Sequence, residues 1–148
     1  MRRSGAGTTE TAARRRDDGS VHEGAVAVMV VDDQRAFRSA AASVIEVTDG
    51  FTLVAEAVSG EQAVRLASER MLDLVLMDVN MPGIGGIEAA KAIHHVARDV
   101  VVVLVSTYEP SDLPADVHRS GRAYLHKERL DPDVLKALWD GRGSRRDR

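Results

Sequence analysis

Leu74-Val75-Leu76-Met77-Asp78 is the most informative segment of the chain, because an acid closes a run of apolar residues predicted as a strand over Leu72–Met77. An earlier apolar run, Ala27–Val31, closes in the same way on Asp32 and Asp33. Apolar runs of this length are typical of strands buried on both faces, as in a parallel sheet covered by helices. The carboxyl ends of such strands meet at one edge, where open α/β folds bind ligands. We therefore expect the three carboxylates to lie close together.

Two further apolar runs end on polar side chains of another kind. Val100–Val105 is followed by Ser106 and Thr107, and Ala123–His126 is followed by Lys127. Each of these residues alone has an ordinary structural interpretation: an acid at a strand end often caps the next helix, and a lone serine or lysine is often solvated. Taken together, an acid pair, an acid, a hydroxyl and an ammonium group suit a divalent cation and a phosphoryl group.

The rest of the chain alternates between strand and helix patterns. A further strand is predicted over Phe51–Ala57. Apolar residues at helical spacing follow the strands and mark four helices. These are Phe37, Ala40, Ala41, Val44 and Ile45; Ala63, Leu66 and Ala67; Ile87, Ala90, Ile93 and Ala97; and Val134, Leu135 and Leu138. The alternation predicts an α/β fold with a doubly wound, five-stranded parallel sheet, because parallel neighbours need crossover connections.

Helix ends are also visible in the sequence. Ser59-Gly60-Glu61-Gln62 predicts a capping box, and Asp131-Pro132 places an N-cap residue before a proline at the first helical position. Pro110 and Pro114 exclude a long helix before Gly121, so we expect a short or irregular helix that begins near Pro114.

Composition sets the limits of the interpretation. A chain of 148 residues has room for one domain with a hydrophobic core. A formal net charge of -3 provides no overall attraction to nucleic acid or anionic membranes, and the apolar runs are too short to span a bilayer. The absence of cysteine excludes disulfides and thiolate chemistry. With no signal-peptide pattern at its start, the chain is expected to be cytoplasmic.

The two ends of the chain contain almost no large apolar residue, so they cannot offset the entropy of being ordered. We therefore expect a disordered N-terminal tail over residues 1–25, a folded domain over 26–140, and a disordered, Arg-rich tail over 141–148. Acids dilute the arginines of both tails, which favours solvated tails over a site for nucleic acid.

Crowded carboxylates repel one another, so a bound cation is the natural partner of Asp32, Asp33 and Asp78. Mg²⁺ prefers oxygen ligands, and with the charge neutralised one carboxylate can attack phosphorus. Lys127 could pair with one phosphoryl oxygen as a point charge, and Ser106 could donate a hydrogen bond to another.

Four segments carry a resemblance to a known family; they are Val30-Val31-Asp32-Asp33, Leu76-Met77-Asp78-Val79-Asn80-Met81-Pro82-Gly83, Ser106 and Tyr124-Leu125-His126-Lys127. The sequence resembles the receiver domain of two-component response regulators over roughly Val26 to Trp139. This resemblance implies a flavodoxin-like receiver fold with strand order 2-1-3-4-5.

The resemblance implies a role for each matching acid. Asp78 would be the phosphoacceptor, modified by a phosphoryl group from a phosphohistidine on a sensor histidine kinase or phosphotransfer protein. The side chains of Asp33 and Asp78 and the main-chain carbonyl of Asn80 would bind Mg²⁺, and Asp32 would assist through water.

The resemblance also implies a switch. Ser106 and Lys127 would hold the phosphoryl oxygens, and Tyr124 would move inward as Ser106 is drawn toward the phosphate. The chain departs from many receivers in having Glu128, not proline, after Lys127, so no cis peptide bond is expected there. That pair is similar to the Lys-Glu or Lys-Asp subgroup of regulators. A second departure is the proline-interrupted stretch before Gly121, in a region that family members use for output or dimerisation.

The functional hypothesis is a stand-alone phosphoacceptor that switches contacts with a downstream protein and catalyses only its own Mg²⁺-dependent phosphorylation and dephosphorylation. It is expected to act as a monomer or weak dimer, without direct DNA binding and without a membrane. Two alternatives stay open: a phosphorylation-independent, receiver-like interaction module, and a Mg²⁺-dependent phosphohydrolase.

Overall fold

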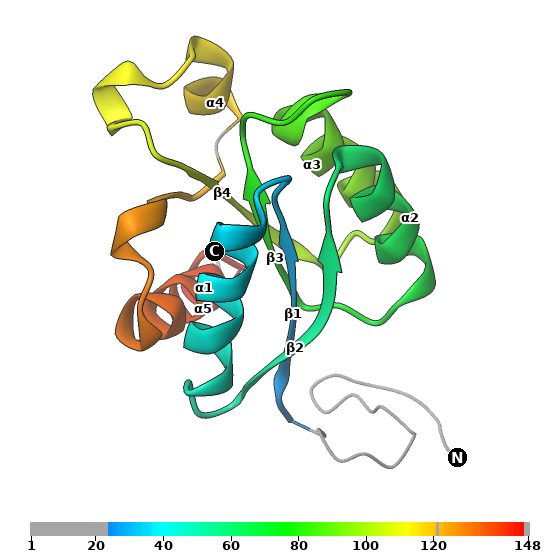
Figure 1. Cartoon of the computed structure of the whole chain (residues 1–148). Coiled ribbons are helices and arrows are strands. Elements are labelled where there is room, and N and C mark those ends of the chain that lie inside the picture. Colours follow the sequence, from blue (N-terminus) through cyan, green and yellow to red (C-terminus); the bar gives the residue numbers. More distant parts are fainter. Residues whose placement is uncertain (1–23, 121, 147–148) are drawn as a thin grey trace.

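The computed structural model describes residues 24–120 and 122–146 (Figure 1). Its five strands form one parallel sheet in the order β2-β1-β3-β4-β5, which confirms the doubly wound topology predicted from the sequence. The strands are β1 (Val26–Val31), β2 (Phe51–Ala57), β3 (Leu74–Asp78), β4 (Val101–Ser106) and β5 (Tyr124–His126). The helices are α1 (Arg35–Glu46), α2 (Gly60–Glu69), α3 (Gly85–Val96), α4 (Ala115–Arg119) and α5 (Pro132–Arg146). Two 3₁₀ turns complete the described elements, η2 (Pro110–Asp112) and η3 (Lys127–Arg129).

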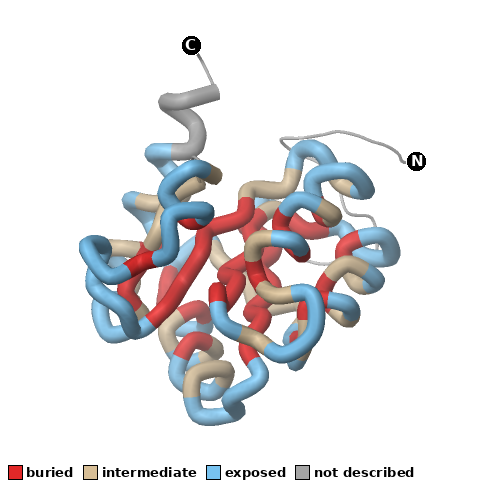
Figure 2. Tube along the Cα trace, turned by 90° about the horizontal axis from the view of Figure 1, so that it is seen from above, coloured by how far each residue is buried: buried red, intermediate tan, exposed pale blue. Residues whose placement is uncertain are grey.

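The sheet is the middle of three layers. Helices α1 and α5 cover one face, and α2 and α3 cover the other (Figure 1). Alternate residues of β1 serve the two faces: Val28 and Val30 pack with α1 and α5, whereas Met29 and Val31 pack with α2 and α3. The buried residues form a central layer between helices whose outer sides are exposed (Figure 2). This double burial is the reason that the strands read as continuous apolar runs.

Strand β2 has the predicted bounds, whereas the other four strands begin one or two residues from their predicted starts. Strand β3 begins at Leu74, and the carboxylate of the preceding Asp73 accepts a hydrogen bond from the main-chain N–H of Ala27 (2.8 Å). Strand β4 begins at Val101 and includes Ser106. The polar residues that end the strands therefore lie where the sequence places them.

Two predicted helix starts are present. The hydroxyl of Ser59 accepts a hydrogen bond from the N–H of Gln62 (3.1 Å), and the side-chain oxygen of Gln62 accepts one from the N–H of Val58 (2.8 Å). At α5, the carboxylate of Asp131 accepts a hydrogen bond from the N–H of Val134 (2.8 Å). The short helix α4 begins directly after Pro114, as the proline pattern predicts.

The last helix extends past residue 140, the predicted end of the folded domain. Helix α5 spans Pro132–Arg146, and the division into a domain over 26–140 and a tail over 141–148 stays a prediction. A helix already nucleated and anchored by the buried Leu135 gains one main-chain hydrogen bond for each added residue, which explains the extension. The expected N-terminal tail, apart from residues 24 and 25, lies outside the described residues.

Two further observations concern the described residues alone. None of their helices combines the length and apolar character that a membrane crossing requires. None of their peptide bonds is cis, in agreement with the expectation for the bond between Lys127 and Glu128.

Candidate functional site at the carboxyl edge of the sheet

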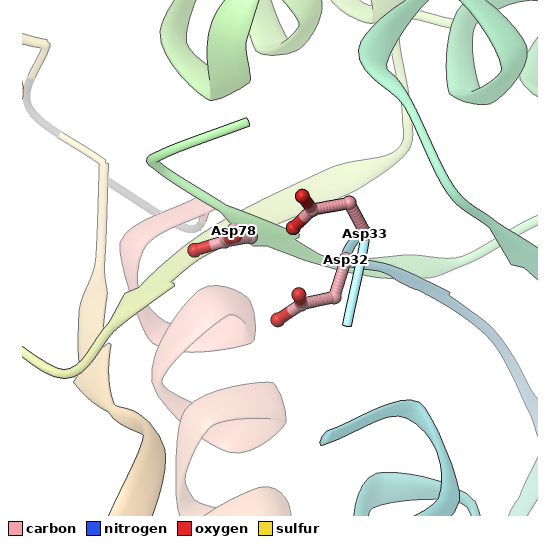
Figure 3. Close-up of side chains that lie close together, drawn as sticks. All are labelled: Asp32, Asp33 and Asp78. Carbon is pink, nitrogen blue, oxygen red and sulfur yellow. The ribbon is translucent and has the colours of Figure 1, made fainter. Parts of the chain in front are cut away.

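Three carboxylates converge where β1 and β3 end side by side. Val31 pairs with Met77 in the parallel register, so Asp32 and Asp33, which follow β1, lie next to Asp78, the last residue of β3. One carboxylate oxygen from each of the three lies within 4.8 Å of the others (Figure 3). Asp32 and Asp78 are buried, whereas Asp33 is exposed. The cluster predicted from separate strand ends is therefore present.

Asp32 makes contacts through its main-chain N–H and both carboxylate oxygens. Its N–H donates to the carbonyl of Ala57 (3.0 Å), and its Oδ1 accepts a hydrogen bond from the N–H of Gln34 (2.8 Å). Its Oδ2 is fully buried and has no hydrogen-bond donor with suitable geometry among the described residues. Lys127 Nζ, at 2.5 Å, supplies an ionic contact to that oxygen. The Oδ2 atom of Asp32 is therefore compensated by an ion pair with Lys127.

Asp78 is an unusually basic carboxylate. Burial raises its pKa from the usual 3.8 to about 6, and the negative charge of Asp32 adds to the rise. Lys127, whose Nζ lies 3.4 Å from Asp78 Oδ1, and the N–H of Asn80, which donates to the same oxygen at 3.4 Å, lower the pKa and only partly offset these effects. Asp78 therefore stores unfavourable charge that a cation or a covalent modification would relieve.

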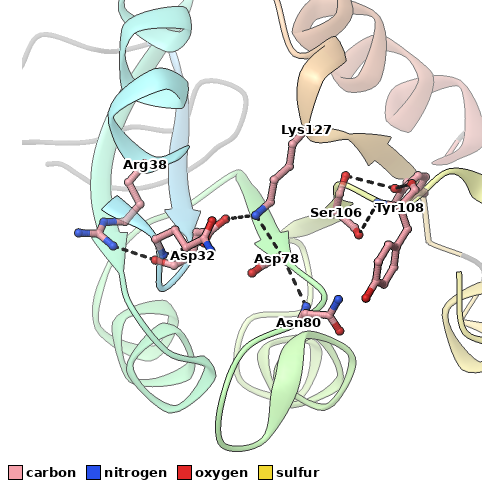
Figure 4. Close-up of polar contacts among 9 residues, drawn as sticks. Asp32, Arg38, Asp78, Asn80, Ser106, Tyr108 and Lys127 are labelled. Atoms are coloured by element: carbon pink, nitrogen blue, oxygen red, sulfur yellow. Dashed lines mark hydrogen bonds and ion pairs between the residues drawn. The ribbon is translucent and has the colours of Figure 1, made fainter. Parts of the chain in front are cut away.

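Lys127 lies between the two buried acids. It follows β5 at the start of η3, and its ammonium group reaches across to Asp32 and Asp78 (Figure 4). The same group lies 4.9 Å from the centre of the Phe37 ring, within the range of a cation–π interaction. The aromatic ring and the two carboxylates thus hold the ammonium group inside the site.

Ser106 and Tyr124 are joined through the segment after β4. The buried Ser106 ends β4, and its hydroxyl accepts a hydrogen bond from the N–H of Tyr108 (3.0 Å; Figure 4). The Tyr124 hydroxyl donates to the carbonyl of Tyr108 and lies 3.3 Å from the carbonyl of Ser106. Burial raises the pKa of Tyr124, so its hydroxyl is protonated and acts as a donor at neutral pH. The residues predicted as a switch are therefore connected to each other in this conformation.

The donor set fits a hard divalent cation. It consists of carboxylate oxygens of Asp32, Asp33 and Asp78, the ligands that Mg²⁺ prefers. Asn80, two residues after Asp78, donates a hydrogen bond from its N–H to the Asp78 carboxylate. The contact of its carbonyl with a metal ion stays a prediction.

Sequence reasoning missed two residues next to the site. Arg38 of α1 donates from Nη1 to the main-chain carbonyl of Asp32 (2.9 Å). Gly86 of α3 passes so close to Asp78 that a Cβ atom on it would lie 2.2 Å from the carbonyl oxygen of Asp78. No motif signals the Arg38 contact, because its acceptor is a main-chain atom in another element. The Gly85-Gly86 pair at the start of a helix pattern was a visible sign of close packing.

The geometry, an α/β sheet that carries an acid cluster with a lysine and a serine at its carboxyl edge, matches a known class of signalling domain. A family model described as the response regulator receiver domain matches residues 28–138. The chain belongs to this family, whose members are signalling proteins and not conventional enzymes.

Two curated relatives illustrate the similarity. Response regulator UvrY of Escherichia coli (strain K12) is 37% identical over 112 residues, which cover 75% of this chain and 51% of that protein. Response regulator GacA of Pseudomonas viridiflava is 38% identical over 114 residues, covering 76% of this chain and 53% of the relative. The chain thus spans about half the length of the curated relatives it matches.

Solved structures of response regulators are also similar to this chain. A LuxR-family response regulator from Aurantimonas sp. SI85-9A1 has a TM-score of 0.69 at 30% identity, covering 79% of this chain and 86% of that chain. The receiver domain of the putative response regulator NarL from Mycobacterium tuberculosis also has a TM-score of 0.69, at 26% identity, covering 78% of this chain and 94% of that chain.

Proposed function

We propose that Asp78 accepts a phosphoryl group from a phosphohistidine and that the modification switches the protein's contacts with a downstream partner. The observation that carries the proposal is the state of Asp78 itself: a buried carboxylate with a pKa of about 6, beside a lysine and two more carboxylates, at the end of the central strand. Family membership supports it, because receivers of this family act in two-component signalling.

Asp33 and Asp78, with the carbonyl of Asn80, would hold Mg²⁺, and Asp32 would assist through water. When bound, the ion would offset the charge of the acids and of the incoming phosphoryl oxygens. The exposed position of Asp33 is consistent with a cation that keeps several water ligands.

In the transfer step, a carboxylate oxygen of Asp78 forms the new P–O bond as the P–N bond to the donor histidine breaks. The departing imidazole nitrogen keeps the electron pair of that bond and takes a proton from solvent. Lys127 already lies 3.4 Å from Asp78 Oδ1 and needs only a short movement to pair with a phosphoryl oxygen. Ser106, at the end of the neighbouring strand, would donate a hydrogen bond to another phosphoryl oxygen.

The switch begins with the loss of a contact at Ser106. Its hydroxyl accepts a hydrogen bond from the N–H of Tyr108, whose carbonyl in turn accepts the hydrogen bond of Tyr124. A Ser106 hydroxyl drawn toward a phosphoryl group would leave the Tyr108 N–H without its acceptor. Tyr124 and the segment after β4 would then move together, and that segment is the surface we propose for the downstream contact.

The donor would be a sensor histidine kinase or a phosphotransfer protein. A cytoplasmic location, the Lys-Glu subgroup, and action as a monomer or weak dimer stay predictions. The lack of direct DNA binding is also untested. The similar DegU of Brevibacillus brevis is named a transcriptional regulatory protein, and this chain covers 49% of it.

The proposal is tested by intact-protein mass spectrometry after incubation with acetyl phosphate and Mg²⁺. Wild type should gain one phosphoryl adduct, whereas Asp78→Ala and a chelator-treated sample should gain none. An adduct of equal yield on Asp78→Ala would overturn the assignment of the phosphoacceptor. If a panel of histidine kinases and acetyl phosphate all leave wild type unmodified, the phosphorylation-independent interaction module becomes the better interpretation.

A further inference from the structure

Arg38 connects α1 to the carboxyl ends of β1 and β2 through two hydrogen bonds. Its Nη1 donates to the main-chain carbonyl of Asp32 (2.9 Å), and its Nε donates to Glu56 Oε1 of β2 (3.1 Å). The Arg38 side chain is 16% exposed, which places most of it within the protein, while its helix neighbour Arg35 is exposed and makes no hydrogen bond or ion pair with the described residues of the site. Figure 4 shows the guanidinium group on the side of Asp32 opposite Lys127.

The carbonyl that Arg38 contacts belongs to the peptide bond between Asp32 and Asp33. Strand β1 ends at Val31, so this carbonyl lies beyond the regular ladder of the sheet. A peptide bond is planar, and fixing its C=O therefore fixes the direction of the N–H and Cα of the next residue. Arg38 thus restrains the N–Cα bond of Asp33, the axis about which that side chain turns, although it does not touch the Asp33 side chain in any described contact.

The orientation of Asp33 is less restrained by surrounding contacts than that of Asp32 or Asp78. Asp32 is buried and held through its N–H and its Oδ1, and Asp78 is buried within β3. Asp33 is exposed and follows the end of the strand. The orientation of an exposed carboxylate depends on its main chain, because few side-chain contacts restrict it.

We propose that Arg38 is a positioning residue for the cation site, acting on Asp33 through the Asp32–Asp33 peptide group. The inference rests on the proposed function, since it assumes that Asp33 binds Mg²⁺. A residue that orients a metal ligand from outside the ligand set alters affinity without contacting the ion.

A positioning role and a purely electrostatic role of Arg38 predict opposite changes in Mg²⁺ affinity when Arg38 is replaced. A positive guanidinium group near the site repels a cation, so its removal would tighten Mg²⁺ binding if charge were its whole effect. If Arg38 positions Asp33, its removal weakens Mg²⁺ binding. The sign of the change therefore distinguishes the two effects, whatever its exact size.

The experiment is a Mg²⁺ titration of the 148-residue chain by isothermal calorimetry, with wild type, Arg38→Ala, Arg38→Lys and Arg35→Ala. We expect Arg38→Ala to bind Mg²⁺ about tenfold more weakly than wild type. Arg38→Lys keeps the charge but loses the two-pronged guanidinium geometry, so it should also bind more weakly than wild type, by a smaller factor. Arg35→Ala removes a positive charge from the same helix, but Arg35 makes no contact with the site. This variant should therefore bind Mg²⁺ as tightly as wild type or slightly more tightly.

A second readout needs no metal ion. In ¹H–¹⁵N spectra of the metal-free protein, the amide signals of Asp33 and Gln34 should shift in both Arg38 variants and stay in place in Arg35→Ala. Urea unfolding in the same buffer identifies any variant that is not folded at the titration temperature. Arg38→Lys is the more conservative change and serves as the test if Arg38→Ala does not fold.

Mg²⁺ affinity at or above the wild-type value in a folded Arg38 variant, with unshifted Asp33 and Gln34 signals, would overturn the inference and leave the proposed function intact. No binding of Mg²⁺ by wild type would instead remove the proposed cation site, and the inference with it.

Discussion

Replacement of Asp78 by asparagine should stabilise the metal-free protein at neutral and alkaline pH. The pKa of Asp78 is about 6 in the folded chain and 3.8 for an ordinary aspartate. At about 1.4 kcal/mol per pKa unit, the ionised side chain costs the folded state about 3 kcal/mol. Asparagine resembles the protonated acid in size and polarity, so Asp78→Asn should remove most of this cost.

The effect should depend on pH with a defined sign. Because the pKa of Asp78 is higher in the folded state, the folded state binds the proton more tightly than the unfolded state does. The resulting stabilisation is complete below about pH 4 and is lost as the pH rises through about 6. Wild type and Asp78→Asn should thus have similar free energies of unfolding near pH 4, and the variant should become more stable by up to about 3 kcal/mol near pH 8.

The assay is urea unfolding followed by far-UV circular dichroism at several pH values, in metal-free buffer. Asp49→Asn is the matched control, because Asp49 is exposed in the turn between α1 and β2 and is not part of the site. Its replacement should leave the pH dependence of the unfolding free energy unchanged. Added Mg²⁺ should stabilise wild type and have little effect on Asp78→Asn. A variant that is less stable than wild type near pH 8, or a difference that does not vary with pH, would refute the reasoning.

Three other substitutions test the site and its support. Lys127→Met leaves the buried carboxylate of Asp32 without its ionic partner, and should lower the free energy of unfolding by about 3–5 kcal/mol in metal-free urea titrations; unchanged stability would show that water replaces the ammonium group. Gly86→Ala places a Cβ against the Asp78 carbonyl and should cost about 1–3 kcal/mol by the same measurement, with lower yield in the acetyl phosphate assay; wild-type values for both would contradict the close approach. Leu135→Ala, at a fully buried position of α5, should cost about 2–5 kcal/mol in unfolding free energy while phosphorylation of the folded fraction persists; a loss below about 1 kcal/mol would place α5 outside the cooperative core.

The elements of the fold were largely predictable because each depends on local sequence. Strand β1, and β3 up to its last residue Asp78, are apolar since both of their faces are covered, and this makes them visible as uninterrupted runs. Ser59 and Asp131 mark helix starts through hydrogen bonds that span only three residues. The end of α5 was not predictable in this way, because Gly141 and the arginines after it lack the apolar pattern that marks a helix.

The convergence of the polar strand-end residues at one edge of the sheet was also predictable, but their pairings were not. Asp78, Ser106 and Lys127 each follow an apolar run, and parallel strands bring such ends to a single edge. The sequence contains no indication that Lys127 lies closer to Asp32 than to Asp78, or that its ammonium group lies over the Phe37 ring. Those distances depend on how helices and strands from distant parts of the chain pack together.

The alternation of strands and helices and the polar residues at the ends of four strands can be recognised in the chain alone, and with them the chemistry available at the edge of the sheet. These features follow from local hydrophobic periodicity and short-range hydrogen bonds. The burial of Asp78, and therefore its raised pKa, and the main-chain carbonyl that Arg38 contacts depend on tertiary packing. The reason is physical: desolvation and hydrogen bonds between elements arise only when segments far apart in sequence exclude water from the same space.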